Sequence, residues 1–506
     1  MARTARFTPA RPRPKVPAAA GCIALAALAV AVPAAWAQRS NITPTFSASL
    51  ELTDNRNLSA TNPEADAITT LSPGIRWSSR SGRVQGSLNY SLNADFYARD
   101  SSANSLSNNL SANLAAELVE QYVFFDANAN ISQQSLSAFG LQGDRGTNAN
   151  STEYGSLTLS TSVRGRPFGA ADFEARLTSN YSGSLDGNSG DVSSQDFVMS
   201  LGESVGAVGW SVVASRSYSS FDGGRATTQD KITPRISYAF DPTFQVFVSG
   251  GYERNDVVSL EPTTFKTWGG GFSWQPTPRT QLGVQTEQRY FGRSWNLNFS
   301  HRMRRWLVSY SDVNDDNELT TGGGSPLSTY DLFFAQFASI EPDPVLRDVL
   351  VRNFLQSTGL DPNQQATAGF VTSAVTVTRN QNLSLAWQGR RNNVVVSAFA
   401  TSSRRVDEIS DAQDDFSQVA RVDQQGMNFS LSHRLTQTAA IVMFGSYQRT
   451  PDQEGVQGND LTELSLSWSD RIGPRSSVAV TGRHTRATGA NPYDENSLLA
   501  TFNYSF

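Results

Sequence analysis

The chain has 506 residues, of which 38% are hydrophobic, and its mean hydropathy is −0.36. Beyond residue 37 no segment contains the 18 or more consecutive apolar residues of a membrane-spanning helix, which excludes a helical membrane protein. The formal net charge is −5, and it falls to about −10 without the five basic residues that precede residue 16. A negative charge of this size argues against nucleic acid as a partner.

The first 37 residues have the organisation of a cleaved secretory signal peptide. Basic residues lie between Arg3 and Lys15, an apolar run covers residues 18–32, and Ala35-Trp36-Ala37 has the small-x-small pattern of a cleavage site. Cleavage removes Cys22, the only cysteine, so the mature chain has no disulfide and no thiolate metal site. We therefore expect a signal peptide at 1–37 and a single domain at 38–506.

Apolar and polar side chains alternate in many segments of that domain. Clear examples are residues 46–52, 84–96, 106–114, 383–387 and 464–468. A period of two over roughly ten residues indicates strands whose two faces have different surroundings. Short connections such as 79–82 and 119–121 alternate with long polar ones such as 54–68, 135–151 and 407–420. Alternating short turns and long loops are typical of transmembrane barrels, with short turns on the periplasmic side.

The region from 304 to 378 interrupts this regular order. Counting strands from the front makes 304–310 an upward strand, and counting from the end makes 366–378 upward too, so a downward strand is expected at 328–338. Leu346, Leu350 and Phe354 have helical spacing, which predicts a short periplasmic helix at 343–360 that caps or enters the lumen, within an insertion at about 340–365. The fold class is therefore an all-β, single antiparallel transmembrane barrel of about 24 strands, with a range of roughly 20 to 26.

The last nine residues, 498–506, alternate largely between apolar and polar side chains and end on Phe506. This ending is typical of the strand that closes a bacterial outer-membrane barrel. It predicts a location in the outer membrane of a Gram-negative cell, with both termini in the periplasm.

Three stretches resemble the outer-membrane barrels of the PEP-CTERM/exosortase system, which accompany exopolysaccharide biosynthesis. They are Leu52-Thr-Asp-Asn55, Pro73-Gly74-Ile75 and the block 117–134, ELVEQYVFFDANANISQQ. The resemblance extends to chain length and the helical interruption near residue 350. It implies a role in export or assembly of an extracellular polysaccharide, but it carries over no catalytic position.

No catalytic residue, cofactor or metal is predicted, so we expect a protein that is not an enzyme. The histidines, His301, His433 and His484, lie far apart without metal-ligand spacing, and no Gly-x-Ser-x-Gly motif is present. The acidic run 312–318 resembles the start of a calcium-binding loop, but it lacks the glycine at position six and the glutamate at position twelve. We interpret it as a solvated acidic loop.

Charged side chains of both signs are predicted to line the lumen. If the alternation is in phase, the inward residues are Arg83, Arg176, Arg235, Arg289, Arg390, Arg434, Asp126, Asp172, Glu174, Glu253 and Glu287. These groups either pair with one another and brace a wide lumen, or form a path along which an acidic polymer binds and slides.

Three functions stay open: a channel or assembly factor for exopolysaccharide, a general diffusion porin, and a structural or adhesive surface barrel with a plugged lumen. The expected partners are outer-membrane lipid and lipopolysaccharide. An acidic exopolysaccharide and periplasmic or inner-membrane export components are expected for the first function.

Overall fold

The computed structural model describes residues 40–80, 82–143, 148–169, 171–185, 191–221, 225–317, 321–322, 369–372, 374–407 and 414–506, together with ten residues between 330 and 355. The predicted signal peptide at 1–37 lies outside the described residues.

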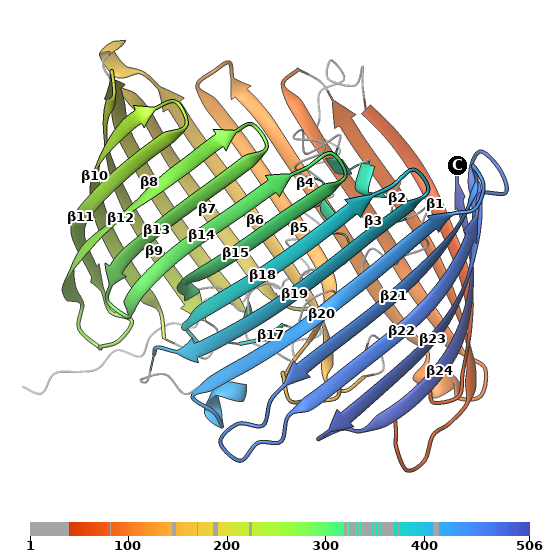
Figure 1. Cartoon of the computed structure of the whole chain (residues 1–506). Coiled ribbons are helices and arrows are strands. Elements are labelled where there is room, and N and C mark those ends of the chain that lie inside the picture. The colour runs from red at the N-terminus through yellow and green to blue at the C-terminus, as the bar shows by residue number, and fades with distance from the viewer. Residues whose placement is uncertain are drawn as a thin grey trace, which may run out of the picture.

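Twenty-two antiparallel strands form one sheet, in which each strand is hydrogen-bonded to the next along the chain. The sheet closes because β1 also pairs with β24, so the chain forms a barrel (Figure 1). Within the described part of the chain, no helix is long and apolar enough to cross a membrane.

The strands of the barrel are β1 (Ser40–Thr53), β2 (Asp66–Arg80), β3 (Val84–Tyr97), β4 (Ser105–Val119), β5 (Val123–Ser135), β6 (Ser151–Gly165), β7 (Asp172–Ser184), β8 (Val192–Val205), β9 (Val208–Phe221), β10 (Thr227–Asp241), β11 (Phe244–Asn255), β12 (Thr263–Thr277), β13 (Thr280–Arg289), β14 (Gly292–Arg302), β15 (Trp306–Asn317), β18 (Thr376–Gln388), β19 (Asn392–Arg405), β20 (Arg421–Arg434), β21 (Ala439–Thr450), β22 (Asn459–Asp470), β23 (Ser476–Gly489) and β24 (Tyr493–Ser505). Two further strands, β16 (Thr321–Gly322) and β17 (Phe370–Val371), pair with each other outside the barrel sheet. In the described residues, the short 3-10 helices η2 (Ser101–Ala103), η3 (Pro167–Gly169) and η4 (Asp415–Ser417) lie in connections.

The two ends of the barrel differ in their connections. At one end, here the short-turn end, the turns include 206–207, 242–243, 278–279, 303–305 and 389–391. At the other, the long-loop end, the connections include 54–65, 98–104, 136–150, 406–420 and 451–458. Ser40 and Phe506 both lie at the short-turn end, because the pairing of β1 with β24 places Thr45 opposite Ser505. This confirms the predicted grading of the connections and the role of the last strand in closing the barrel.

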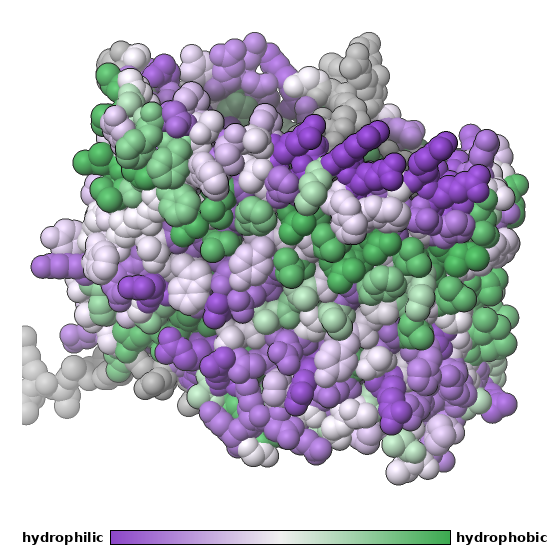
Figure 2. Space-filling model, in the orientation of Figure 1, coloured by the Kyte–Doolittle hydropathy of each residue, from purple (hydrophilic) through white to green (hydrophobic). Residues whose placement is uncertain are grey.

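The outer face of the barrel is apolar and exposed. Leu383 is 47% exposed, Leu466 58% and Phe240 63%. In Figure 2 apolar residues cross the middle of one side of the barrel, with polar residues above and below. Towards the short-turn end the outer face carries aromatic pairs, such as Trp306 with Trp387 at 6.1 Å between ring centroids. An apolar band with aromatic residues at its margin is the surface that a barrel presents to a bilayer.

The structure differs from the expected strand order between 304 and 378. β15 pairs directly with β18, from Trp306 opposite Trp387 to Asn317 opposite Thr376. The count is therefore 22, within the predicted range and two below the preferred number.

The strand expected at 328–338 is absent from the described residues, which are helical there. They are Tyr330, Phe333, Phe334 and Phe337. Their spacing of three, four and seven residues places all four rings on one face of a helix, which is why this segment does not alternate as a strand.

Candidate functional site

Residues 318–375, here called the insert, join the barrel at the long-loop end through β15 and β18. Its buried side chains Phe333, Val351 and Leu355 pack against wall residues that face the lumen, Val395 of β19 and Val442 and Phe444 of β21. These wall residues lie within a few positions of the short-turn end of their strands. Both ends of the insert therefore join the barrel at the long-loop end, while its described residues Phe333, Val351 and Leu355 lie deep in the lumen.

The helix predicted at 343–360 is present in the described residues of that range, Arg347, Asp348, Leu350, Val351, Arg352 and Leu355. It lies inside the barrel, and the chain reaches it from the long-loop end and not from the short-turn end. The sequence predicts the helix on the periplasmic, short-turn side. Because β15 pairs directly with β18, both ends of the insert lie at the long-loop end of the barrel.

Polar contacts connect the two described helical parts of the insert. The Tyr330 hydroxyl donates to Asp348 at 2.5 Å, and Arg352 Nε donates to the same carboxylate at 2.7 Å. The Arg352 guanidinium also lies 4.5 Å from the Tyr330 ring centroid. Arg76 of β2 interacts electrostatically with Arg352 and Asp348, so the insert also lies near a second part of the wall.

The connections at the long-loop end are tied to one another across the mouth of the barrel. Ser137, in the connection between β5 and β6, donates to Asp415 of η4 at 2.6 Å, and the Ala138 amide donates to the same carboxylate at 2.7 Å. Tyr493 at the start of β24 donates to the Gln142 carbonyl at 2.7 Å.

Apolar packing reinforces these bonds. Its members, here called the loop cluster, come from three segments: Ala138, Phe139, Phe370, Ala374, Phe416, Val419 and Val422. Because Phe370 and Ala374 belong to the insert, the loops and the insert form one packed unit at the mouth.

Several predicted lumen residues form ion pairs within the wall. Arg176 pairs with Glu174 at 3.0 Å and with Asp126 at 3.5 Å. Arg289 pairs with Glu253 at 2.8 Å, and Glu253 is completely buried. The pairs of Arg176 with Asp126 and of Arg289 with Glu253 each span three strands, from β5 to β7 and from β11 to β13.

Of two further predicted residues, one forms an ion pair and the other lies against an aromatic ring. Glu287 pairs with Lys231 at 2.7 Å. Arg235 has its guanidinium 4.1 Å from the Phe247 ring centroid, and no carboxylate among the described residues pairs with it.

Four of the predicted residues lie at the short-turn rim and not in the middle of the lumen. Arg83 pairs with Glu120 at 2.7 Å, and Asp172 pairs with Arg166 at 2.9 Å. Arg390 and Arg434 are exposed in or beside turns. The eleven predicted residues are therefore spread along the wall and one rim and do not form a single site.

Other lumen charges were not predicted. Arg483 of β23 pairs with Glu51 of β1 at 3.0 Å and with Glu495 of β24 at 3.9 Å, which crosses the closure of the barrel. The alternation already places Glu51 on the polar face of its strand, so the sequence contained a signal for it. Its partner Arg483 depends on the pairing of the first and last strands, which alternation alone does not provide.

The acidic run at 312–318 is not a solvated loop, which corrects the sequence interpretation. Its described residues belong to β15, up to Asn317. Asp312 accepts from Arg379 at 2.6 Å and from Trp295 Nε1 at 2.9 Å, while Asp315 pairs with Arg289 at 2.6 Å. The carboxylates form ion pairs with arginines of β18 and β13, which lets them occupy a strand.

A closed antiparallel barrel with an apolar outer band and a charged lumen defines a transmembrane β-barrel of the outer-membrane type. No family model and no curated protein matches the sequence. The solved structures similar to it include a mutant of the ferric enterobactin receptor PfeA from Pseudomonas aeruginosa, with a TM-score of 0.48 and 9% identity over 93% of this chain and 81% of that one.

The FrpB iron transporter from Neisseria meningitidis has a TM-score of 0.47 and 9% identity, over 92% of this chain and 81% of its own. OpdQ from Pseudomonas aeruginosa has a TM-score of 0.30 and 8% identity, over 92% of this chain and 98% of its own.

Proposed function

We propose that this protein is a non-catalytic outer-membrane barrel, closed at rest, that serves in export or assembly of an exopolysaccharide in a PEP-CTERM/exosortase system. The observation that supports the closed state is the packing of Phe333, Val351 and Leu355 of the insert onto the lumen wall. Each is at most 2% exposed, and burial of such a side chain contributes about 1.5–3 kcal/mol. The insert is therefore a stably docked element.

The docked insert favours this proposal over a general diffusion porin. Barrels of roughly 16 to 18 strands leave an open aqueous channel, whereas barrels of about 22 strands usually contain a plug. In this chain the plug is an internal segment that is continuous with the loop cluster. Phe370 and Ala374 of the insert pack in the loop cluster, and on this basis we propose that movement of the loops accompanies undocking of the insert.

The polysaccharide role rests on the sequence resemblance and is compatible with the wall chemistry. Arg235 over Phe247 offers a guanidinium and an aromatic face without a competing carboxylate among the described residues. Such a pair suits an acidic sugar, and many weak contacts of this kind let a polymer bind and still move. Periplasmic and inner-membrane export components are the partners that this role requires.

A structural or adhesive surface barrel is the second candidate, because a filled lumen is equally compatible with it. The experiment that separates the two is a deletion strain in which periplasmic and secreted polysaccharide are assayed separately. We expect polymer to accumulate in the periplasm or its synthesis to stop, and the full-length gene to restore secretion. Unchanged secretion would reject the export role and leave the surface barrel.

A further inference from the structure

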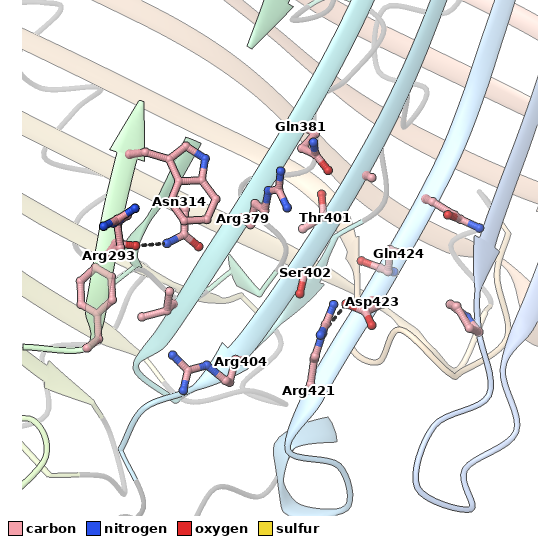
Figure 3. Close-up of a pocket in the computed structure, with 16 residues that line it drawn as sticks. Arg293, Asn314, Arg379, Gln381, Thr401, Ser402, Arg404, Arg421, Asp423 and Gln424 are labelled. Atoms are coloured by element: carbon pink, nitrogen blue, oxygen red, sulfur yellow. Dashed lines mark hydrogen bonds and ion pairs between the residues drawn. The ribbon is translucent and has the colours of Figure 1, made fainter. Parts of the chain in front are cut away.

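A cavity of about 630 Å³ opens on β14, β15, β18, β19 and β20 near their long-loop end (Figure 3). Its lining includes four arginines and two aromatic side chains: Arg293, Arg379, Arg404, Arg421, Trp295 and Phe291. Hydroxyl and amide side chains, among them Ser402, Gln381 and Asn314, line the rest. Arg379 and Trp295 are the partners of Asp312 described above, and none of the lining residues belongs to the ion pairs of the lumen.

The register of the strands places this cavity on the outside of the barrel. Asp312 and Arg379 share the strand faces of Tyr310 and Leu383, which pair with each other and lie in the outer apolar band. Ala386, on the opposite face of β18, packs against the insert in the lumen. Arg379 lies four residues nearer the long-loop end than Leu383, so the cavity is at the margin of the apolar band.

The cavity has an excess of positive charge. Arg379 is fixed by Asp312 at 2.6 Å and lies 5.2 Å from the Trp295 ring centroid, and Arg421 pairs with Asp423 at 2.7 Å. Arg293 and Arg404 form no ion pair with any described carboxylate. Four guanidinium groups thus face two carboxylates, and two guanidinium groups are left for an outside anion.

The position of Arg404 strengthens this argument. It lies directly opposite Arg421 in the pairing of β19 with β20. Like charges directly opposite each other destabilise a sheet. A phosphate between them removes the repulsion and accepts hydrogen bonds from both guanidinium groups.

We propose that this cavity binds the phosphorylated sugar headgroup of an outer-leaflet glycolipid of the lipopolysaccharide type. Arg293 and Arg404 contact its phosphates, while the amide and hydroxyl side chains contact its sugar hydroxyls. The acyl chains then lie along the apolar band beside Leu383. The proposal depends on the outer-membrane location and on the long-loop end facing outwards, but not on polymer export.

The test uses the full mature chain, purified in detergent, with bisphosphorylated lipid A as the probe and native mass spectrometry as the readout. We expect the wild type to retain one tightly bound lipid A and R293Q/R404Q to bind it at least tenfold more weakly. The matched control is R390Q/R475Q, which removes the same charge from exposed arginines at the short-turn rim. This control is expected to bind as the wild type does.

Two outcomes would overturn the proposal. An equal loss in both double variants means that only overall charge matters. Equal binding of phosphatidylglycerol at the same residues means that the cavity takes any anionic lipid.

Because R404Q removes the repulsion with Arg421, its lipid-free melting temperature should not fall, and lipid A should raise it less than in the wild type. A polymer secretion assay is independent of both measurements, so the two proposals can fail separately.

Discussion

The ion pairs of the barrel wall differ in how deeply they are buried. Arg289 has a side chain only 7% exposed and pairs with Glu253, Asp315 and Asp316. Arg83, by contrast, is 54% exposed and pairs with an equally accessible Glu120. Alternation identified both residues as inward, but burial depends on the distance from a turn. Alternation therefore carries no information on how deeply each ion pair is buried.

This difference predicts the effect of removing each guanidinium. R289M leaves the fully buried Glu253 without its ion pair, which typically costs about 3–5 kcal/mol. R83Q removes an exposed pair and should cost at most about 1 kcal/mol. Urea unfolding of the barrel in lipid vesicles measures both free energies. A loss of at most about 1 kcal/mol in R289M as well would show that the Arg289 network contributes no more than an exposed ion pair.

The contact at Asp415 predicts a pH-dependent loop cluster. Burial raises the pKa of Asp415, and the nearby Asp414 adds to this effect, while the hydrogen bonds from Ser137 and Ala138 oppose it. A raised pKa means that the packed loops favour the protonated carboxyl. The contact is therefore strongest at acid pH and weakens as the pH rises through the raised pKa.

Hydrogen exchange in residues 136–143, corrected for the intrinsic rate, measures this effect. We expect protection to increase as the pH falls from 7 towards 4. D415N keeps an acceptor for the Ala138 amide and has no charge, so its protection should not change with pH. Protection that decreases in acid, or the same slope in D415N, would contradict the assignment to Asp415.

Among the elements, the strands were predictable and the location of the insert was not. Residues 46–52 and 383–387 alternate because one face meets lipid and the other meets water, and this physical requirement is local. In the insert, Phe333 and Leu355 face neither lipid nor water, because they pack against β19 and β21. These strands follow later in the chain. Its helical part was recognisable from the spacing of Leu346, Leu350 and Phe354. Its place inside the lumen depends on tertiary contacts.

Weakening the docking of the insert should open the lumen. F333S/L355S removes two buried apolar side chains, and each truncation of this kind costs about 2–5 kcal/mol. The open fraction should therefore rise more than tenfold in single-channel recordings from planar bilayers. M443S, on the outer face of β21, is the control, and it should stay closed. A silent double variant with a folded barrel would instead support the surface-barrel function.

For the whole molecule, the long loops, the two junctions of the insert with the barrel and the arginine-rich outer cavity all lie at one end of the barrel. The two termini lie at the other end. Chain closure between β1 and β24 was predictable from the last nine residues, because an alternating strand needs a partner. The contacts between distant loops were not, since Ser137 and Asp415 are 278 residues apart in the sequence and alternation says nothing of their proximity.

The orientation in the membrane is open to a direct test, because the mature chain contains no cysteine once the predicted signal peptide is removed. Thr61 is exposed at the long-loop end, and Gln437 is exposed in a turn at the short-turn end. If the long loops face outwards, a membrane-impermeant maleimide added to intact cells should label T61C. It should label Q437C only after the cells are broken, and the unsubstituted chain should take no label. The reverse pattern would place the outer cavity in the inner leaflet and so remove the glycolipid as its ligand.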